Sequence, residues 1–107
     1  MSLLPLQAAD IPVPGQRRLL LRAGREIALF NLDGQLYAID DSCPHAGAAL
    51  CTGKLDGPLI QCPAHGLRFD LRTGAMPGTA SPGLRVQTYP VQQNGDDWAL
   101  VLPDAAE

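Results

Sequence analysis

Two five-residue stretches, CPHAG at 43–47 and CPAHG at 62–66, constrain this chain more than any other feature of its sequence. Together they contain both histidines and two of the three cysteines in a chain of 107 residues. Thiolate and imidazole groups are the protein ligands that zinc and iron–sulfur clusters use. We therefore expect the fold to bring the two stretches together around one metal centre.

In each stretch a cysteine is followed two or three positions later by a histidine. The four candidate ligands are Cys43, His45, Cys62 and His65. A proline follows each cysteine and fixes φ there, which stiffens the loop. The ligand set suits a tetrahedral zinc site with two cysteines and two histidines. It equally suits a two-iron, two-sulfide cluster in which the cysteines bind one iron and the histidines the other.

Most of the remaining sequence predicts short β-strands. The expected strands span 17–23, 25–32, 35–40, 84–93 and 97–102. Asp33-Gly34 and Asn94-Gly95 separate consecutive strands and are typical of tight hairpin turns. Successive side chains of a strand point to opposite faces, so in the expected strand at 35–40 Leu36 and Ala38 lie on one face and Tyr37 and Ile39 on the other. The eleven glycines and ten prolines leave little room for long helices.

Residues 41–83 lack regular periodicity and contain both Cys/His stretches, with short apolar runs at 58–61 and 67–71 and a loop at 74–83. We therefore expect an all-β fold: an antiparallel β-sandwich or small barrel with an inserted, loop-rich metal-binding subdomain. The chain is expected to form a single domain over 1–107. Its base strands would lie at about 1–40 and 84–102, with the insertion at about 41–83.

Charge and hydropathy exclude several classes of function. A formal net charge of −3 argues against a nucleic-acid partner, because binding phosphates requires a basic face. No apolar run is long enough to span a membrane, and the first residues do not resemble a secretory signal, so we expect a cytoplasmic protein. Aspartates 40, 41, 56 and 70 lie near the Cys/His stretches. They could form an acidic rim that steers a basic partner, although such charges more often belong to solvated surface.

The two stretches resemble the signature of the Rieske iron–sulfur family, C-x-H-x-G and C-P-x-H-G, about sixteen to eighteen residues apart. The resemblance runs from LYAIDDSCPHAGAAL through GPLIQCPAHGLRFDLRTG to the proline-containing loop before LRVQTYPV. It implies one Rieske [2Fe–2S] cluster per chain, with Cys43 and Cys62 on one iron and His45 and His65 on the other. Cys51 is expected to be a small buried residue with no part in the cluster.

Members of this family in respiratory and photosynthetic complexes brace the cluster with a disulfide. Ala48 and Ala64 occupy the matching positions here, so no brace is expected. Those members also have a serine and a tyrosine whose hydrogen bonds raise the reduction potential, where this chain has Leu67 and Phe69. Fewer donors to the cluster shift the potential downward, to a value near −150 mV, at the low end of the Rieske range of about −150 to +300 mV.

The resemblance indicates an electron carrier rather than an enzyme. Rieske oxygenases need further histidines for a mononuclear iron, and this chain has none left once the cluster is made. It is similar to ferredoxins that pass single electrons from a flavin-dependent reductase to a terminal, aromatic ring-hydroxylating oxygenase. Docking is expected to be transient and to occur near His45 and His65.

The docking rim is expected to consist of small apolar residues: Pro44, Ala46, Pro63, Ala64 and Pro82. Two other functions remain open. Within the family, the chain could be the small Rieske subunit of an assimilatory nitrite reductase. From a different class, it could be a zinc-stabilised binding module.

Overall fold

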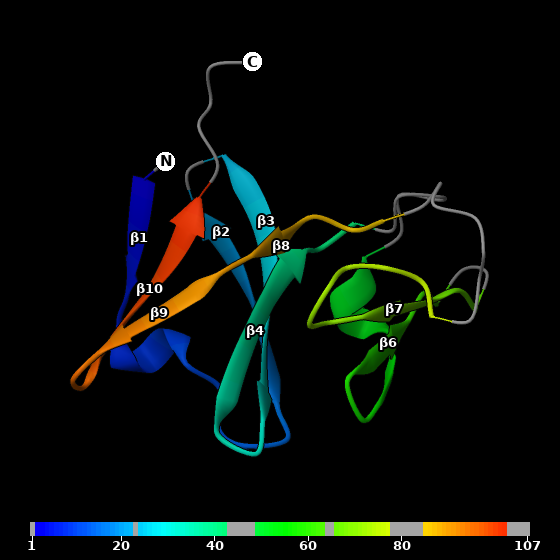
Figure 1. The fold of residues 1–107 in the computed structure, drawn as a ribbon, viewed down its shortest axis with the longest axis horizontal. Coiled ribbons are helices and arrows are strands. Elements are labelled where there is room, and N and C mark those ends of the chain that lie inside the picture. Colours follow the sequence, from blue (N-terminus) through cyan, green and yellow to red (C-terminus); the bar gives the residue numbers. More distant parts are fainter. Residues whose placement is uncertain (1, 23, 43–48, 64–65, 78–84, 103–107) are drawn as a thin grey trace.

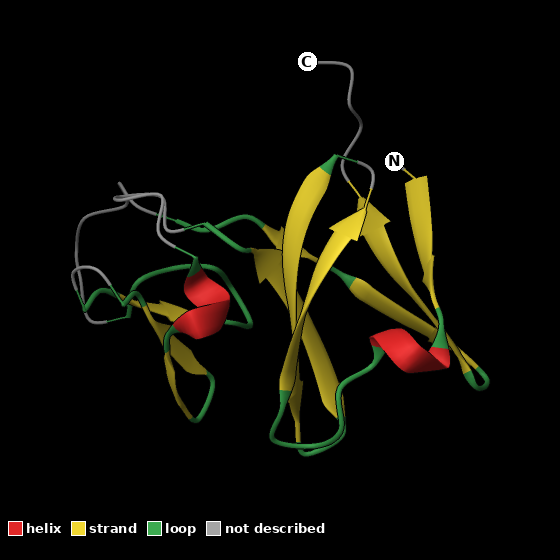
Figure 2. Ribbon diagram, turned by 180° about the vertical axis from the view of Figure 1, so that it is seen from behind, coloured by secondary structure: helices red, strands yellow, loops and turns green. Residues whose placement is uncertain are grey.

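The computed structural model describes residues 2–22, 24–42, 49–63, 66–77 and 85–102. These residues form short antiparallel strands and two single-turn 3-10 helices, η1 (Ala8–Asp10) and η2 (Leu50–Thr52) (Figure 2). This confirms the all-β class expected from the sequence.

The strands form three antiparallel sheets (Figure 1). The first has the order β1–β10–β9, made from β1 (Ser2–Leu6), β10 (Asp97–Leu102) and β9 (Val91–Asn94). The second has the order β2–β3–β4–β8, made from β2 (Arg17–Arg22), β3 (Arg25–Leu32), β4 (Gln35–Asp40) and β8 (Thr88–Tyr89). The third has the order β5–β6–β7, made from β5 (Lys54–Asp56), β6 (Leu59–Gln61) and β7 (Arg68–Asp70).

Strands β3 and β4 of the second sheet are buried on both faces, because a different cluster of apolar side chains packs against each face. Leu36 and Ala38 of β4 join one core with Leu100 and Leu102 of the first sheet. Ile39 belongs to the other core, and Tyr37 packs against it, as the alternation predicted. Burial on both faces also explains the nearly continuous apolar run in β3.

The other core joins the second sheet to the third. Ala28, Phe30 and Ile39 come from the second sheet, and Ile60 and Phe69 come from the third. In Figure 1 the third sheet lies to the right of the two base sheets. All of its strands fall within the segment expected to carry the metal site.

Both hairpins are confirmed, one with a small shift. Asp33 and Gly34 have φ values of 53° and 90° between β3 and β4, as a type I′ turn requires. In the other hairpin Asn94 still pairs with Asp97, so Gly95 and Asp96 form the turn and Asn94 ends β9. The turn residues therefore lie one position later than the Asn-Gly pair suggested.

Two expectations about the base strands were incomplete. The segment 84–93 is not one strand, because β8 pairs with β4 and β9 pairs with β10, with Pro90 between them. Proline has no N–H to continue a ladder, and here its carbonyl accepts a hydrogen bond from the Val101 N–H (2.8 Å). The periodicity also missed β1, which pairs along its length with β10.

A carboxylate stabilises the turn that follows β7. Asp70 accepts hydrogen bonds from the Arg72 N–H (2.8 Å), Nε (3.0 Å) and Nη2 (2.7 Å). The hydrogen bonds from the Arg72 side chain hold the pKa of Asp70 below its ordinary value of 3.8. Its stabilising effect is therefore present above pH 4 or so and is lost as the pH falls through the lowered pKa.

We expect Asp70→Asn to lower the melting temperature by a few degrees at neutral pH, measured by circular dichroism. The difference from the wild type should shrink progressively as the pH falls below about 4 and through the lowered pKa of Asp70, because the stabilising carboxylate is protonated over that range. Asp56→Asn is the matched control, since Asp56 is 72% exposed and lies 3.7 Å from Arg68. Equal effects of the two substitutions at neutral pH would contradict this role for Asp70.

Candidate metal centre

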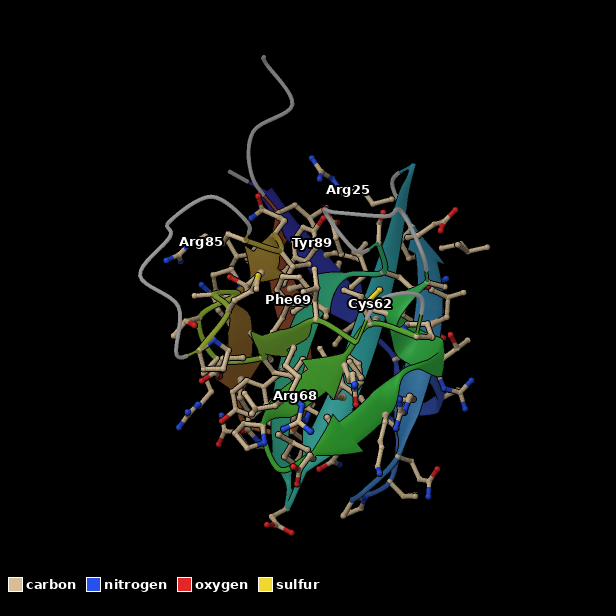
Figure 3. The ribbon with its side chains drawn as sticks, turned by 90° about the vertical axis from the view of Figure 1, so that its right-hand side faces the viewer. Arg25, Cys62, Arg68, Phe69, Arg85 and Tyr89 are labelled. Carbon is tan, nitrogen blue, oxygen red and sulfur yellow. The ribbon has the colours of Figure 1, made fainter. Side chains whose placement is uncertain are left out.

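Of the four candidate ligands, Cys62 is the one that the structure describes. Cys43, His45 and His65 lie outside the described residues, as do Ala48 and Ala64. The geometry of the site is therefore built from the second Cys/His stretch and from the segments that lead into and out of both stretches. Figure 3 looks onto this end of the molecule.

The second stretch begins where β6 ends. The Cys62 N–H donates to the Leu67 carbonyl (2.7 Å), and the Gly66 N–H donates to the Cys62 carbonyl (2.9 Å). Gly66 has a φ of +75°, a left-handed conformation that glycine adopts without strain. These bonds close a tight loop at its base and return the chain directly into β7.

This loop runs from the interior to the surface. Cys62 is 1% exposed and belongs to the core that contains Leu50, Ile60 and Phe69. The neighbouring Pro63 and Gly66 are exposed. The chain therefore turns outward immediately after a buried cysteine whose thiol is shielded from water.

The surroundings of Cys62 fit a metal–thiolate ligand. An apolar environment disfavours an isolated thiolate, whereas coordination to a metal stabilises the deprotonated form. The same environment limits access of water, which protects a bound iron–sulfur cluster and tunes its potential. Cys62 is thus suited to holding an iron of a [2Fe–2S] cluster.

The strand that leads into the first stretch is fixed at its end by polar contacts. The Tyr89 hydroxyl donates a short hydrogen bond to Asp40 Oδ1, and Arg25 Nη1 donates to the Tyr89 hydroxyl oxygen (3.1 Å). Burial raises the pKa of Tyr89, and the hydrogen bond to Asp40 raises it further. No sequence pattern indicated this group, because Arg25 and Asp40 are far from Tyr89 along the chain.

The two ends of the proline-containing loop are joined. Ala75 and Arg85 form an antiparallel bridge, and the Val86 N–H donates to the Gly74 carbonyl (2.9 Å). Gly74 has a φ of +81°, and a Cβ there would lie 2.2 Å from the Val86 carbonyl oxygen. Glycine at this position therefore permits the close approach of the two segments. Pro82, the part of this loop expected to line the docking rim, lies outside the described residues.

Comparison with known proteins decides between the zinc and iron–sulfur interpretations. Residues 3–90 match the Rieske [2Fe-2S] domain. The chain belongs to the Rieske family.

The Rieske chain is 38% identical over 97 residues to the 3-phenylpropionate/cinnamic acid dioxygenase ferredoxin subunit of Escherichia coli K12, covering 87% of this chain and 88% of the relative. It is similar in structure to the ferredoxin of carbazole 1,9a-dioxygenase from Nocardioides aromaticivorans IC177 (TM-score 0.76, 31% identity, 94% of this chain and 99% of the other). A further match is a chain in a complex of reduced oxygenase and oxidized ferredoxin in carbazole 1,9a-dioxygenase (TM-score 0.77, 30% identity, 92% and 100%).

These findings confirm the [2Fe–2S] cofactor expected from the sequence. The cofactor is a Rieske-type [2Fe–2S] cluster, and the chain is an electron-transfer component rather than a catalytic enzyme. Within the described residues, no helix has the length and apolar character needed to cross a membrane.

Proposed function

We propose that this Rieske ferredoxin carries single electrons from a flavin-dependent reductase to a terminal, aromatic ring-hydroxylating oxygenase in the cytoplasm. One domain over residues 1–107 would hold one cluster, with Cys43 and Cys62 on one iron and His45 and His65 on the other. The observation that carries the proposal is the buried Cys62 at the start of a closed surface loop, in a chain resembling dioxygenase ferredoxins over most of its length.

The geometry of the loop that begins at Cys62 supports transfer of the electron through the nearby protein surface. When bound, the cluster supplies a one-electron couple. Cys62 anchors the buried side of the loop, and Pro63 and Gly66, on either side of residues 64–65, are exposed. Docking near His45 and His65 would let a partner approach this edge and leave again, as transient electron-transfer contacts require.

Two described residues support a low reduction potential. Leu67 packs against the core that contains Cys62, and Phe69 is fully buried within it. Neither side chain has a hydroxyl group that could donate a hydrogen bond to a cluster sulfur or to the Cys62 thiolate. Losing such donors leaves the more negative, reduced state less stabilised, which lowers the potential.

We expect a reduction potential of about −150 mV at pH 7, measured by protein-film voltammetry. A value well above zero would place the protein with the high-potential carriers of respiratory complexes and would contradict the proposed role.

Anaerobic mixing of the reduced protein with an oxidised Rieske oxygenase, followed by stopped-flow absorbance, tests the transfer itself. A permanent complex with a large haem protein would instead indicate the nitrite reductase subunit.

A further inference from the structure

Basic side chains line the outer face of the third sheet beside Cys62. The register pairs Lys54 with Gln61 and Gln61 with Arg68, so these three residues form one row across β5, β6 and β7. Residues directly opposite one another in a sheet share a face. Because Ile60 and Phe69 point into the core, this row faces solvent, and both Lys54 and Arg68 are exposed.

Two more arginines lie near the joined ends of the proline-containing loop. Arg72 projects from the turn after β7, with 59% of its side chain exposed. Arg85 is exposed, and its Nη1 donates to the Thr73 carbonyl oxygen (3.0 Å), which carries no formal charge. Figure 3 shows Arg68 and Arg85 on different sides of Phe69, with Cys62 on the same face of the molecule.

The acidic residues near this face do not form the exposed rim that the sequence suggested. Asp41 is 3% exposed, and the Asp70 side chain is 13% exposed beneath Arg72. Asp40 accepts the hydrogen bond from Tyr89. Asp56 is exposed on the same face of the third sheet and lies 3.7 Å from Arg68, so it offsets part of the charge of that arginine.

Further exposed carboxylates lie on the base sheets. Asp96 and Asp97 lie at the β9–β10 turn, at the end of the molecule opposite the third sheet (Figure 1). The chain as a whole has a formal charge of −3. Four of the eight Lys and Arg residues thus lie around the second Cys/His stretch of a protein that is negative overall, and Asp56 and Asp70 offset part of their charge.

We propose that Lys54, Arg68, Arg72 and Arg85 form a cationic rim that docks an acidic surface of a partner protein. The inference rests on the proposed function, since the rim adjoins the edge at which the electron is expected to leave. Complementary charge at this edge would attract the acidic partner and orient the carrier with its cluster-binding end forward. The negative base sheets would be repelled by the same surface.

Oxidation of the dithionite-reduced protein by two small ions tests the sign of the charge at this edge. With hexacyanoferrate(III), an anion, we expect the rate constant to fall about threefold between low and high salt. With hexaammineruthenium(III), a cation, the rate constant should rise with salt. The opposite pattern, which the net charge of −3 alone would produce, would overturn the proposal.

Charge-reversal variants locate the effect. Arg68→Glu with Arg85→Glu should reverse both salt dependences, and the neutral pair Arg68→Gln with Arg85→Gln should flatten them. Arg18→Glu is the matched control, because Arg18 is exposed on β2 of the base and should leave the sign unchanged. A double variant that behaves like Arg18→Glu would overturn the assignment of the rim.

An oligo-glutamate peptide serves as the model of an acidic protein surface. We expect it to slow oxidation of the wild-type protein by hexacyanoferrate(III), with no effect on the double Glu variant; equal inhibition of both would contradict docking at the rim.

The visible and EPR spectra of each sample separate this proposal from the function on which it rests. Loss of the cluster signal in the wild type would refute the electron carrier, whereas an intact cluster with the wrong salt dependence would refute only the cationic rim.

Discussion

Replacing Cys62 with serine is expected to abolish binding of the [2Fe–2S] cluster. Serine is similar in size but lacks the thiolate that iron–sulfur clusters require. The replacement also places a hydroxyl group in the apolar core that contains Ile60 and Phe69. We expect purified Cys62→Ser protein to lack the visible absorbance of the cluster and to contain almost no iron.

The same substitution should reduce stability, because metal binding contributes to the folding free energy of small metal-dependent domains. Cys51→Ser is the control: Cys51 belongs to the single turn η2 and has no place in the ligand pattern. It should retain iron and absorbance at the wild-type level. Cluster loss in Cys51→Ser, or a wild-type cluster in Cys62→Ser, would contradict the proposed ligand set.

Gly53→Ala is expected to destabilise the protein by about 3 kcal/mol. A Cβ at this position would lie 1.9 Å from the Gln61 carbonyl oxygen and 3.2 Å from the Leu50 carbonyl oxygen. Gly53 has an ordinary φ of −78°, so the cost comes from lack of space rather than from backbone strain. Relieving the overlap requires moving β6, and β6 leads directly into Cys62.

The movement would also disturb the junction between the base and the third sheet. Arg17 Nη1 donates to the Gly53 carbonyl oxygen (2.5 Å), and its guanidinium lies 5.6 Å from the centre of the Phe30 ring. We therefore expect Gly53→Ala to release iron faster than the wild type, as well as to unfold at lower urea concentration. Urea titration and the decay of visible absorbance measure the two effects.

Gly57→Ala is the matched control for this prediction. Gly57 lies in the turn between β5 and β6 with a φ of +58°, and a Cβ there meets nothing within 4 Å. Gly57→Ala should destabilise the protein by about 1 kcal/mol, because alanine is strained in the left-handed backbone conformation. A Gly53→Ala protein no less stable than Gly57→Ala would show that β6 and η2 adjust more readily than the close contact implies.

Features of the fold that depend on local sequence could be predicted. The strands at 25–32 and 35–40 follow from β-forming residues, and the turn at Asp33-Gly34 follows from residues that tolerate positive φ. The strand β1 could not be predicted, because SLLPL is short, contains a proline and pairs with β10 at the other end of the chain. Strands of three residues, such as β6, are too short to show a period.

Some features of the candidate site could likewise be predicted from the sequence, and others could not. The ligand pattern was visible in sequence, because residue chemistry and spacing alone favour a metal centre. The contacts around it were not visible, since Arg25, Asp40 and Tyr89 meet only through tertiary structure. For the same reason the sequence suggested an acidic rim, whereas Asp41 is buried and both Asp56 and Asp70 lie beside arginines.

We infer that this chain holds a Rieske cluster through two cysteines and two histidines. The most direct test is the iron and acid-labile sulfide content of the purified protein, together with its EPR spectrum after reduction by dithionite. We predict about two irons and two sulfides per chain, with an average g value below that of all-cysteine ferredoxins. One zinc ion per chain and no labile sulfide would contradict the account, leaving a metal-stabilised module in place of an electron carrier.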